Sequence, residues 1–107
     1  MVIKEEISEA KFTELIKDID MLKLAVDVKK EIVAAGCYFH MDCAEELIKD
    51  GSSSANIWGA NIYPEEKKLD FSAVFNIRPL LNNRSMEIQD VAIKEKVAAI
   101  IRKLLPL

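Results

Sequence analysis

Alternating hydrophobic and polar residues between Leu22 and Val28 are the pattern of a strand with one buried face. The polar break at residues 29–31 predicts a turn into a return strand from Glu31 to about Phe39. Gly36 would form a bulge in that strand. A helix over the same residues is the alternative, since apolar residues also recur at helical spacing. The β-branched content favours the hairpin.

A second hairpin is predicted further along the chain. Ile57–Tyr63 reads as one strand, residues 64–68 as the turn, and Leu69–Ile77 as the return strand. The return strand would place alternate apolar residues on one face, namely Leu69, Phe71, Ala73 and Phe75.

Three segments with apolar residues every three or four positions predict amphipathic helices. Their predicted N-terminal caps are Ser8, Asp42 and Asp90. Their predicted ends fall near Asp20, at Gly51 and at Pro106. Residues 2–7 are a candidate edge strand ahead of the first helix.

These elements predict one α+β domain over residues 1–107, with a four-stranded antiparallel sheet from two hairpins and three helices over one face. The 107-residue length fits one modest core, and half of the residues are hydrophobic. A net charge of −3 provides no general attraction for nucleic acid, so no nucleic-acid partner is expected.

The chain lacks a signal-peptide pattern and any apolar run near the roughly 20 residues that a membrane span needs. A soluble, cytoplasmic protein without a membrane partner is therefore expected. The two cysteines, Cys37 and Cys43, are six residues apart, a spacing typical of neither a redox pair nor a disulfide scaffold. We expect both to be reduced.

The stretch from Asn76 to Glu87 is the densest in directional hydrogen-bonding groups, with two of the three arginines and three of the five asparagines. Arg78 and Arg84 flank a loop that leads to a helix N-terminus, where anions are favoured. Two guanidinium groups could hold a phosphate or carboxylate, with Asn83 and Ser85 adding neutral contacts. The alternative is an internal clamp in which Arg84 pairs with Glu87 or Asp90.

His40, the single histidine, forms a His-x-Asp pair with Asp42 at a strand-to-helix junction. A histidine oriented by a carboxylate could act as a general base or bind a metal. Asp42 is also the expected helix cap, which competes with that role. Cys37, His40 and Cys43 would form a zinc tripod only on a continuous helix, and a fourth ligand is missing, so no metal site is predicted.

Trp58 stands beside a glycine and three residues before Asn61, so its ring could form the floor of a pocket. The alternative is a core tryptophan whose indole nitrogen is satisfied.

Five pieces of the sequence together resemble a family of short, uncharacterised prokaryotic proteins with no assigned activity. The similarity covers roughly residues 21–100. The family pattern usually has a glutamine near Ser54 and a glycine near Asn82, where this chain differs. The pieces are His40-Met41-Asp42, Gly51-Ser52, Trp58-Gly59-Ala60-Asn61-Ile62-Tyr63-Pro64, Asn76-Ile77-Arg78-Pro79 and Asn83-Arg84-Ser85.

For function, the sequence favours a small module that binds an anionic small ligand through the Arg78–Arg84 loop. Two alternatives stay open: a small acid/base hydrolase that uses His40, and a homodimeric interaction protein without catalysis. No motif identifies a cofactor, and the sequence does not decide whether the protein is an enzyme. The candidate ligand-binding residues are Arg78, Arg84, Asn83, Ser85, His40, Asp42, Trp58 and Asn61.

Overall fold

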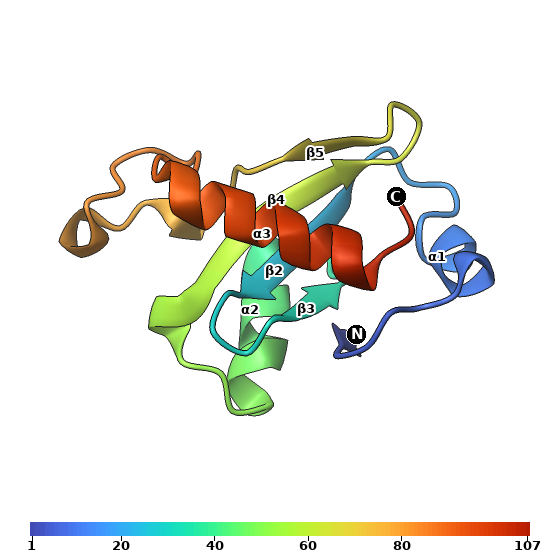
Figure 1. The fold of residues 1–107 in the computed structure, drawn as a ribbon, viewed down its shortest axis with the longest axis horizontal. Helices are drawn as coiled ribbons and strands as arrows, with labels where there is room; N and C mark the ends of the chain where they lie inside the picture. Colours follow the sequence, from blue (N-terminus) through green and yellow to red (C-terminus); the bar gives the residue numbers. More distant parts are fainter.

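A five-stranded antiparallel sheet forms the centre of the computed structural model, which describes all 107 residues (Figure 1). The order across the sheet is β1-β3-β2-β4-β5. The α+β class is confirmed, but the predicted four strands are wrong, because the N-terminal candidate pairs with β3 as an extra edge strand. The strands are β1 (Val2–Ile3), β2 (Leu22–Asp27), β3 (Ile32–Ala35), β4 (Ile57–Tyr63) and β5 (Lys68–Asp70).

The helices cover both faces of the sheet rather than the single face predicted. The helix α3 (Val91–Leu104) crosses one face, α2 (His40–Lys49) lies behind the other, and α1 (Glu9–Leu15) lies at one end (Figure 1). The physical reason is that both faces of the central strands are apolar. Leu24 faces the α3 core, whereas Ala25 packs with residues of α2. None of the helices is both long and apolar enough to cross a membrane.

Two of the predicted helix caps are confirmed. The Ser8 hydroxyl accepts a hydrogen bond from the backbone N–H of Lys11 at 3.1 Å, and one Asp90 carboxylate oxygen accepts from two backbone N–H groups in the first turn of α3. The third is wrong: α2 already begins at His40, and Asp42 accepts from the backbone N–H of Phe39 at 3.1 Å, from inside the first turn.

The candidate edge strand at residues 2–7 ends at Ile3, and three further elements end earlier than their patterns predicted. The helix α1 stops at Leu15 instead of near Asp20. The chain then turns through Asp18, whose φ of 59° is left-handed. The strand β3 stops at Ala35 rather than Phe39, because Gly36 has φ of +80° and turns the chain instead of forming a bulge.

The return strand of the second hairpin also ends early, at Asp70 instead of Ile77. Beyond it, the buried side-chain amide of Asn76 takes the place of a strand. It accepts from the backbone N–H of Gly59 at 2.8 Å and donates to the carbonyl of Gly59 at 3.0 Å. Glycine at position 59 allows the segment that carries Asn76 to pack this closely, because a Cβ there would lie 2.3 Å from the Cβ of Ala73. The Asn76 amide therefore makes the hydrogen bonds to the β4 backbone that the predicted strand would have made.

Cys37 and Cys43 form a disulfide, which corrects the expectation that both are reduced. That expectation relied on the six-residue spacing of the two cysteines, which does not give their distance in the fold. The chain reverses at Gly36 before entering α2, so the two Cα atoms lie 5.6 Å apart, within the range of a disulfide.

Candidate functional site

Arg78 is the half-buried cation of the long loop between β5 and α3. Its guanidinium carbon lies 5.0 Å from the centroid of the Trp58 ring and 5.8 Å from that of Phe75. Nε donates to the carbonyl of Phe75 at 3.0 Å, and Nη1 donates to that of Ala55 at 3.3 Å. No carboxylate forms an ion pair with it. Desolvation lowers the pKa of Arg78 from its ordinary range, while the guanidinium stays charged at neutral pH.

The Arg78 cleft is an open depression of about 470 Å³ beside this guanidinium. Small ligands bind in pockets of roughly 300 to 1,000 Å³ whose walls are mostly apolar with a few polar groups. The Arg78 cleft matches both features, because its volume falls in this range and its wall is mostly apolar with one cation. Its lining residues are Ser54, Ala55, Phe75, Arg78, Pro79, Leu80 and Leu81.

His40 belongs to a second polar group on the α2 side of the sheet. As the first residue of α2, it places Nε2 2.6 Å from Oδ1 of Asn61 and 3.2 Å from the carbonyl of Ala60. Asn61 Nδ2 in turn donates to Asp70 Oδ2 at 2.8 Å and to the carbonyl of Ser72 at 2.9 Å. A chain of hydrogen bonds thus runs from His40 through Asn61 to Asp70.

This chain fixes the tautomer of the imidazole. Asp70 and the Ser72 carbonyl both accept, so the Asn61 amide nitrogen must face them and its oxygen must face His40. Nε2 of His40 therefore carries a hydrogen, and the lone pair of the neutral ring lies on Nδ1. No group of the protein hydrogen-bonds Nδ1.

The two polar groups meet at Phe75. A second depression, of about 370 Å³, is lined by Lys23, Phe39, His40, Met41, Val74 and Phe75. The Phe75 ring stands edge-on to His40 with centroids 6.3 Å apart, and it also lines the Arg78 cleft. Phe75 is thus the wall shared by the His40 depression and the Arg78 cleft.

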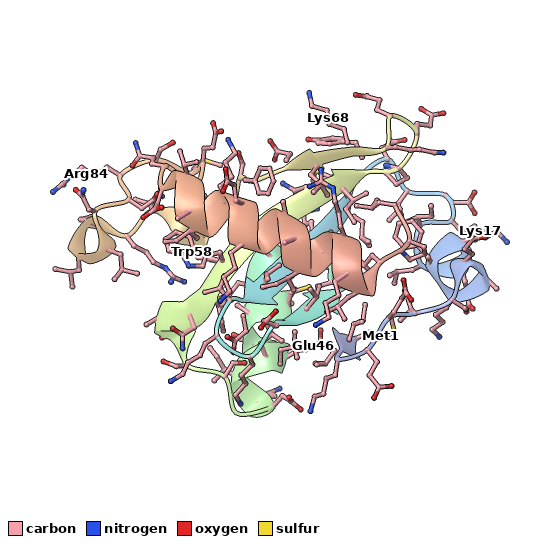
Figure 2. All side chains as sticks on the ribbon, in the orientation of Figure 1. Met1, Lys17, Glu46, Trp58, Lys68 and Arg84 are labelled. Carbon is pink, nitrogen blue, oxygen red and sulfur yellow. A yellow bond between two sulfur atoms is a disulfide. The ribbon has the colours of Figure 1, made fainter.

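Arg84 does not join Arg78 in one cleft. It is exposed at the outer tip of the loop and points away from the ribbon (Figure 2). The alternative internal clamp is also wrong. Glu87 pairs with Lys94 at 2.9 Å, and Asp90 caps α3. Neither arginine therefore has a carboxylate partner, but only Arg78 lies beside a cleft.

Asn83 and Ser85 have structural contacts within the loop. The buried amide nitrogen of Asn83 lies within hydrogen-bonding distance of three backbone carbonyls, and its oxygen accepts from the backbone N–H of Gln89 at 2.7 Å. The Ser85 hydroxyl accepts from the backbone N–H of Glu87 at 3.1 Å. Asp42, at the start of α2, bonds the Phe39 backbone rather than His40. The predicted His-x-Asp pair is therefore not formed.

Sequence reasoning missed Phe75 and Asp70. The signal for Asp70 was available in the second hairpin: a turn at 64–67 pairs Asn61 with Asp70 directly across the strands. Phe75 offered no such signal, because its position depends on where β5 stops.

The fold and site together define a small α+β domain with an arginine cleft and a histidine depression on either side of one phenylalanine. The chain belongs to the family described as "Protein of unknown function (DUF5674)", whose model matches residues 1–104. No curated protein and no solved structure matches the chain.

Proposed function

We propose that this protein binds a small ligand that carries a carboxylate or phosphate group on an apolar body, with Arg78 as the anchor. The observation that carries the proposal is a half-buried guanidinium without a carboxylate partner at the wall of a cleft. Partial burial of a charge costs free energy that an opposite charge offsets. A bound anion would supply that charge and would move the pKa of Arg78 back upward.

The guanidinium retains donors for such a ligand. It has five N–H groups, and the protein uses Nε and Nη1 for one hydrogen bond each. The remaining donors suit the two oxygens of a carboxylate or phosphate. Trp58 and Phe75 hold the guanidinium plane through cation–π contacts, so a ligand would meet a cation with little freedom left to lose.

The apolar part of the ligand follows from the rest of the cleft. Leu80 is 100% exposed and Leu81 47%, both in the wall beside Arg78. Exposed apolar surface of this kind is covered favourably by an apolar ligand, at roughly 25 cal/mol per Å² removed from water. Phenyl phosphate or benzoate should therefore bind more tightly than inorganic phosphate or acetate.

The test is a thermal-shift and calorimetry panel of these four anions on the parent protein and two variants. Arg78→Lys keeps the charge and loses the planar fork, so affinity should fall by about 1 to 3 kcal/mol for each charged hydrogen bond lost. Arg84→Lys is the matched control, because Arg84 lies outside the cleft, and it should bind like the parent. A parent protein that phenyl phosphate and benzoate stabilise no more than chloride does would refute the proposal.

A second candidate function is general-base hydrolysis at His40, favoured by one specific observation. The chain from Asp70 through Asn61 holds the imidazole in the tautomer whose free Nδ1 can take a proton from water. The depression beside it is largely apolar and contains Lys23, whose ammonium could stabilise a developing negative charge. An ester or amide with an apolar acyl group would match that depression.

A further inference from the structure

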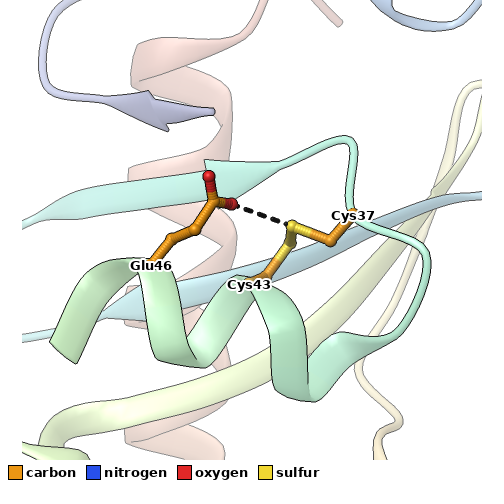
Figure 3. A group of neighbouring side chains, drawn as sticks. All are labelled: Cys37, Cys43 and Glu46. Atoms are coloured by element: carbon orange, nitrogen blue, oxygen red, sulfur yellow. Dashed lines mark hydrogen bonds between the residues drawn. A yellow bond between two sulfur atoms is a disulfide. The ribbon is translucent and has the colours of Figure 1, made fainter. Parts of the chain in front are cut away.

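Cys37, Cys43 and Glu46 form a cluster of metal-ligand types, and none of the three lines either depression described above (Figure 3). Cys43 and Glu46 are three residues apart on α2 and so share a face, while Cys37 comes from the loop that follows Gly36. One ligand atom from each residue lies within 4.8 Å of the others. The turn after β3 and the first two turns of α2 build this cluster.

The contact between Glu46 and Cys37 is incomplete in the oxidised protein. A Glu46 carboxylate oxygen lies 3.1 Å from the Cys37 sulfur, along the dashed line in Figure 3. A disulfide sulfur has no hydrogen, so the carboxylate faces a sulfur that cannot donate to it. Reduction gives Cys37 a thiol that can donate, and a metal ion would attract the carboxylate and both sulfurs together.

We propose that reduction of the Cys37–Cys43 disulfide converts this cluster into a Zn²⁺ site with two thiolates and the Glu46 carboxylate as ligands. The reductant is a dithiol: it gives two electrons and two protons, the S–S bond breaks to two thiols, and the dithiol becomes a disulfide. Zinc binding then releases the two thiol protons. Oxidation joins the sulfurs again and removes two of the three ligands.

The geometry fits the coordination of zinc. Ligands about 2.0 to 2.3 Å from a tetrahedral zinc ion lie roughly 3.3 to 3.8 Å from one another. The three donor atoms lie within 4.8 Å of one another in the oxidised protein, so after the S–S bond breaks the two sulfurs need only move apart to this spacing. Three protein ligands leave a fourth position for water or another ligand. Cys43 is fully buried, whereas Cys37 and Glu46 are half-buried, so a reductant and an ion can approach from the side of Cys37.

Charge also favours a divalent ion there. Two thiolates and a carboxylate carry three negative charges, and the one cation that pairs with the cluster is the Met1 ammonium, 3.1 Å from Glu46 Oε1. The two charges of Zn²⁺ would offset the two negative charges that remain. The site differs from the tripod considered on the sequence, because His40 is held by Asn61 and Glu46 takes its place.

The experiment titrates Co²⁺ as a spectroscopic probe into the full chain, reduced with a dithiol that is then removed under anaerobic conditions, and into the oxidised protein. Thiolate ligation gives an intense charge-transfer band near the ultraviolet. We expect this band to reach its full value at one Co²⁺ per reduced chain, to disappear on addition of Zn²⁺, and to be absent from the oxidised protein. A reduced parent without the band, or a disulfide that the dithiol does not reduce in the folded protein, would overturn the proposal.

Three variants assign the ligands. Cys37→Ser should abolish the band. Glu46→Gln should weaken zinc binding by at least about tenfold, because even the loss of a residue that only orients a metal ligand lowers metal affinity by about 10- to 100-fold. Glu45→Gln, on the exposed side of the same helix, is the matched control and should bind zinc like the parent. Circular dichroism checks that each variant keeps its fold. Equal zinc affinity in Glu46→Gln and Glu45→Gln would remove the carboxylate from the site and overturn the three-ligand proposal.

Discussion

Replacing Asn76 by Ala should be among the most destabilising polar substitutions in this protein. The Asn76 side chain is fully buried and bonds both the N–H and the carbonyl of Gly59, with a further bond to the carbonyl of Met86 at 3.1 Å. Alanine leaves the two Gly59 groups without a partner. A stranded buried donor or acceptor costs about 1 to 3 kcal/mol, so the expected loss is about 2 to 6 kcal/mol. A domain of this size has a total stability of about 5 to 15 kcal/mol.

Urea unfolding followed by tryptophan fluorescence measures this loss, since Trp58 is the single tryptophan and only 2% exposed. The midpoint should fall while the slope with urea stays unchanged, because the unfolded surface is the same. Asn82→Gly is the control: that side chain is exposed and its left-handed φ of 59° suits glycine, so the change should stay within about 0.5 kcal/mol. A loss below 1 kcal/mol in Asn76→Ala would refute the strand-replacing role of the amide.

Two further predictions concern Gly59 and His40. Gly59→Ala should lower the free energy of unfolding by about 1 to 3 kcal/mol or more, because the new Cβ would lie 2.3 Å from that of Ala73; an unchanged urea midpoint would contradict this close packing. If His40 is a general base, His40→Ala should lower the hydrolysis of p-nitrophenyl esters by about 10² or more, with Asn61→Ala in between. Equal rates for parent and His40→Ala, both folded by circular dichroism, would rule out the hydrolase.

Local sequence patterns correctly predicted the elements whose type and ends depend mainly on their own residues. The strand Ile57–Tyr63 matches β4 at both ends, and the cap at Asp90 starts α3 as expected. Periodicity and capping depend on residues that lie within one or two turns of each other, so the local sequence is enough to predict where these elements form. The helices on both faces were harder to predict, because the decisive fact is the apolar character of the second face. On the α2 side, β2 and β3 contribute Ala25, Ile32 and Ala34 to the apolar cluster, and the two alanines are too small to mark an apolar face in the sequence.

The asparagines of the long loop between β5 and α3 show a limit of prediction from spacing alone. Asn83, a predicted ligand contact, is buried and donates to the backbone carbonyl of Asn76, whose own buried side chain bonds Gly59 on β4. Nothing in the spacing distinguishes an amide that binds a ligand from one that binds the chain. The left-handed φ of 59° at Asn82 had a local signal, since asparagine tolerates this conformation better than most residues.

The buried asparagines bear directly on the proposed ligand site, because they hold Arg78 from both sides. Arg78 and Asn83 form an isolated β-bridge, with the Asn83 N–H donating to the Arg78 carbonyl at 3.0 Å, and Asn76 anchors the chain two residues before Arg78. The loop tip that carries the exposed Leu80 is therefore tied at its base. A ligand that meets a preorganised arginine loses less free energy to ordering than one that meets a mobile loop. Conservative changes at Asn83 should thus weaken ligand binding at Arg78 without touching the ligand, whereas changes at Arg84, beyond the bridge, should not.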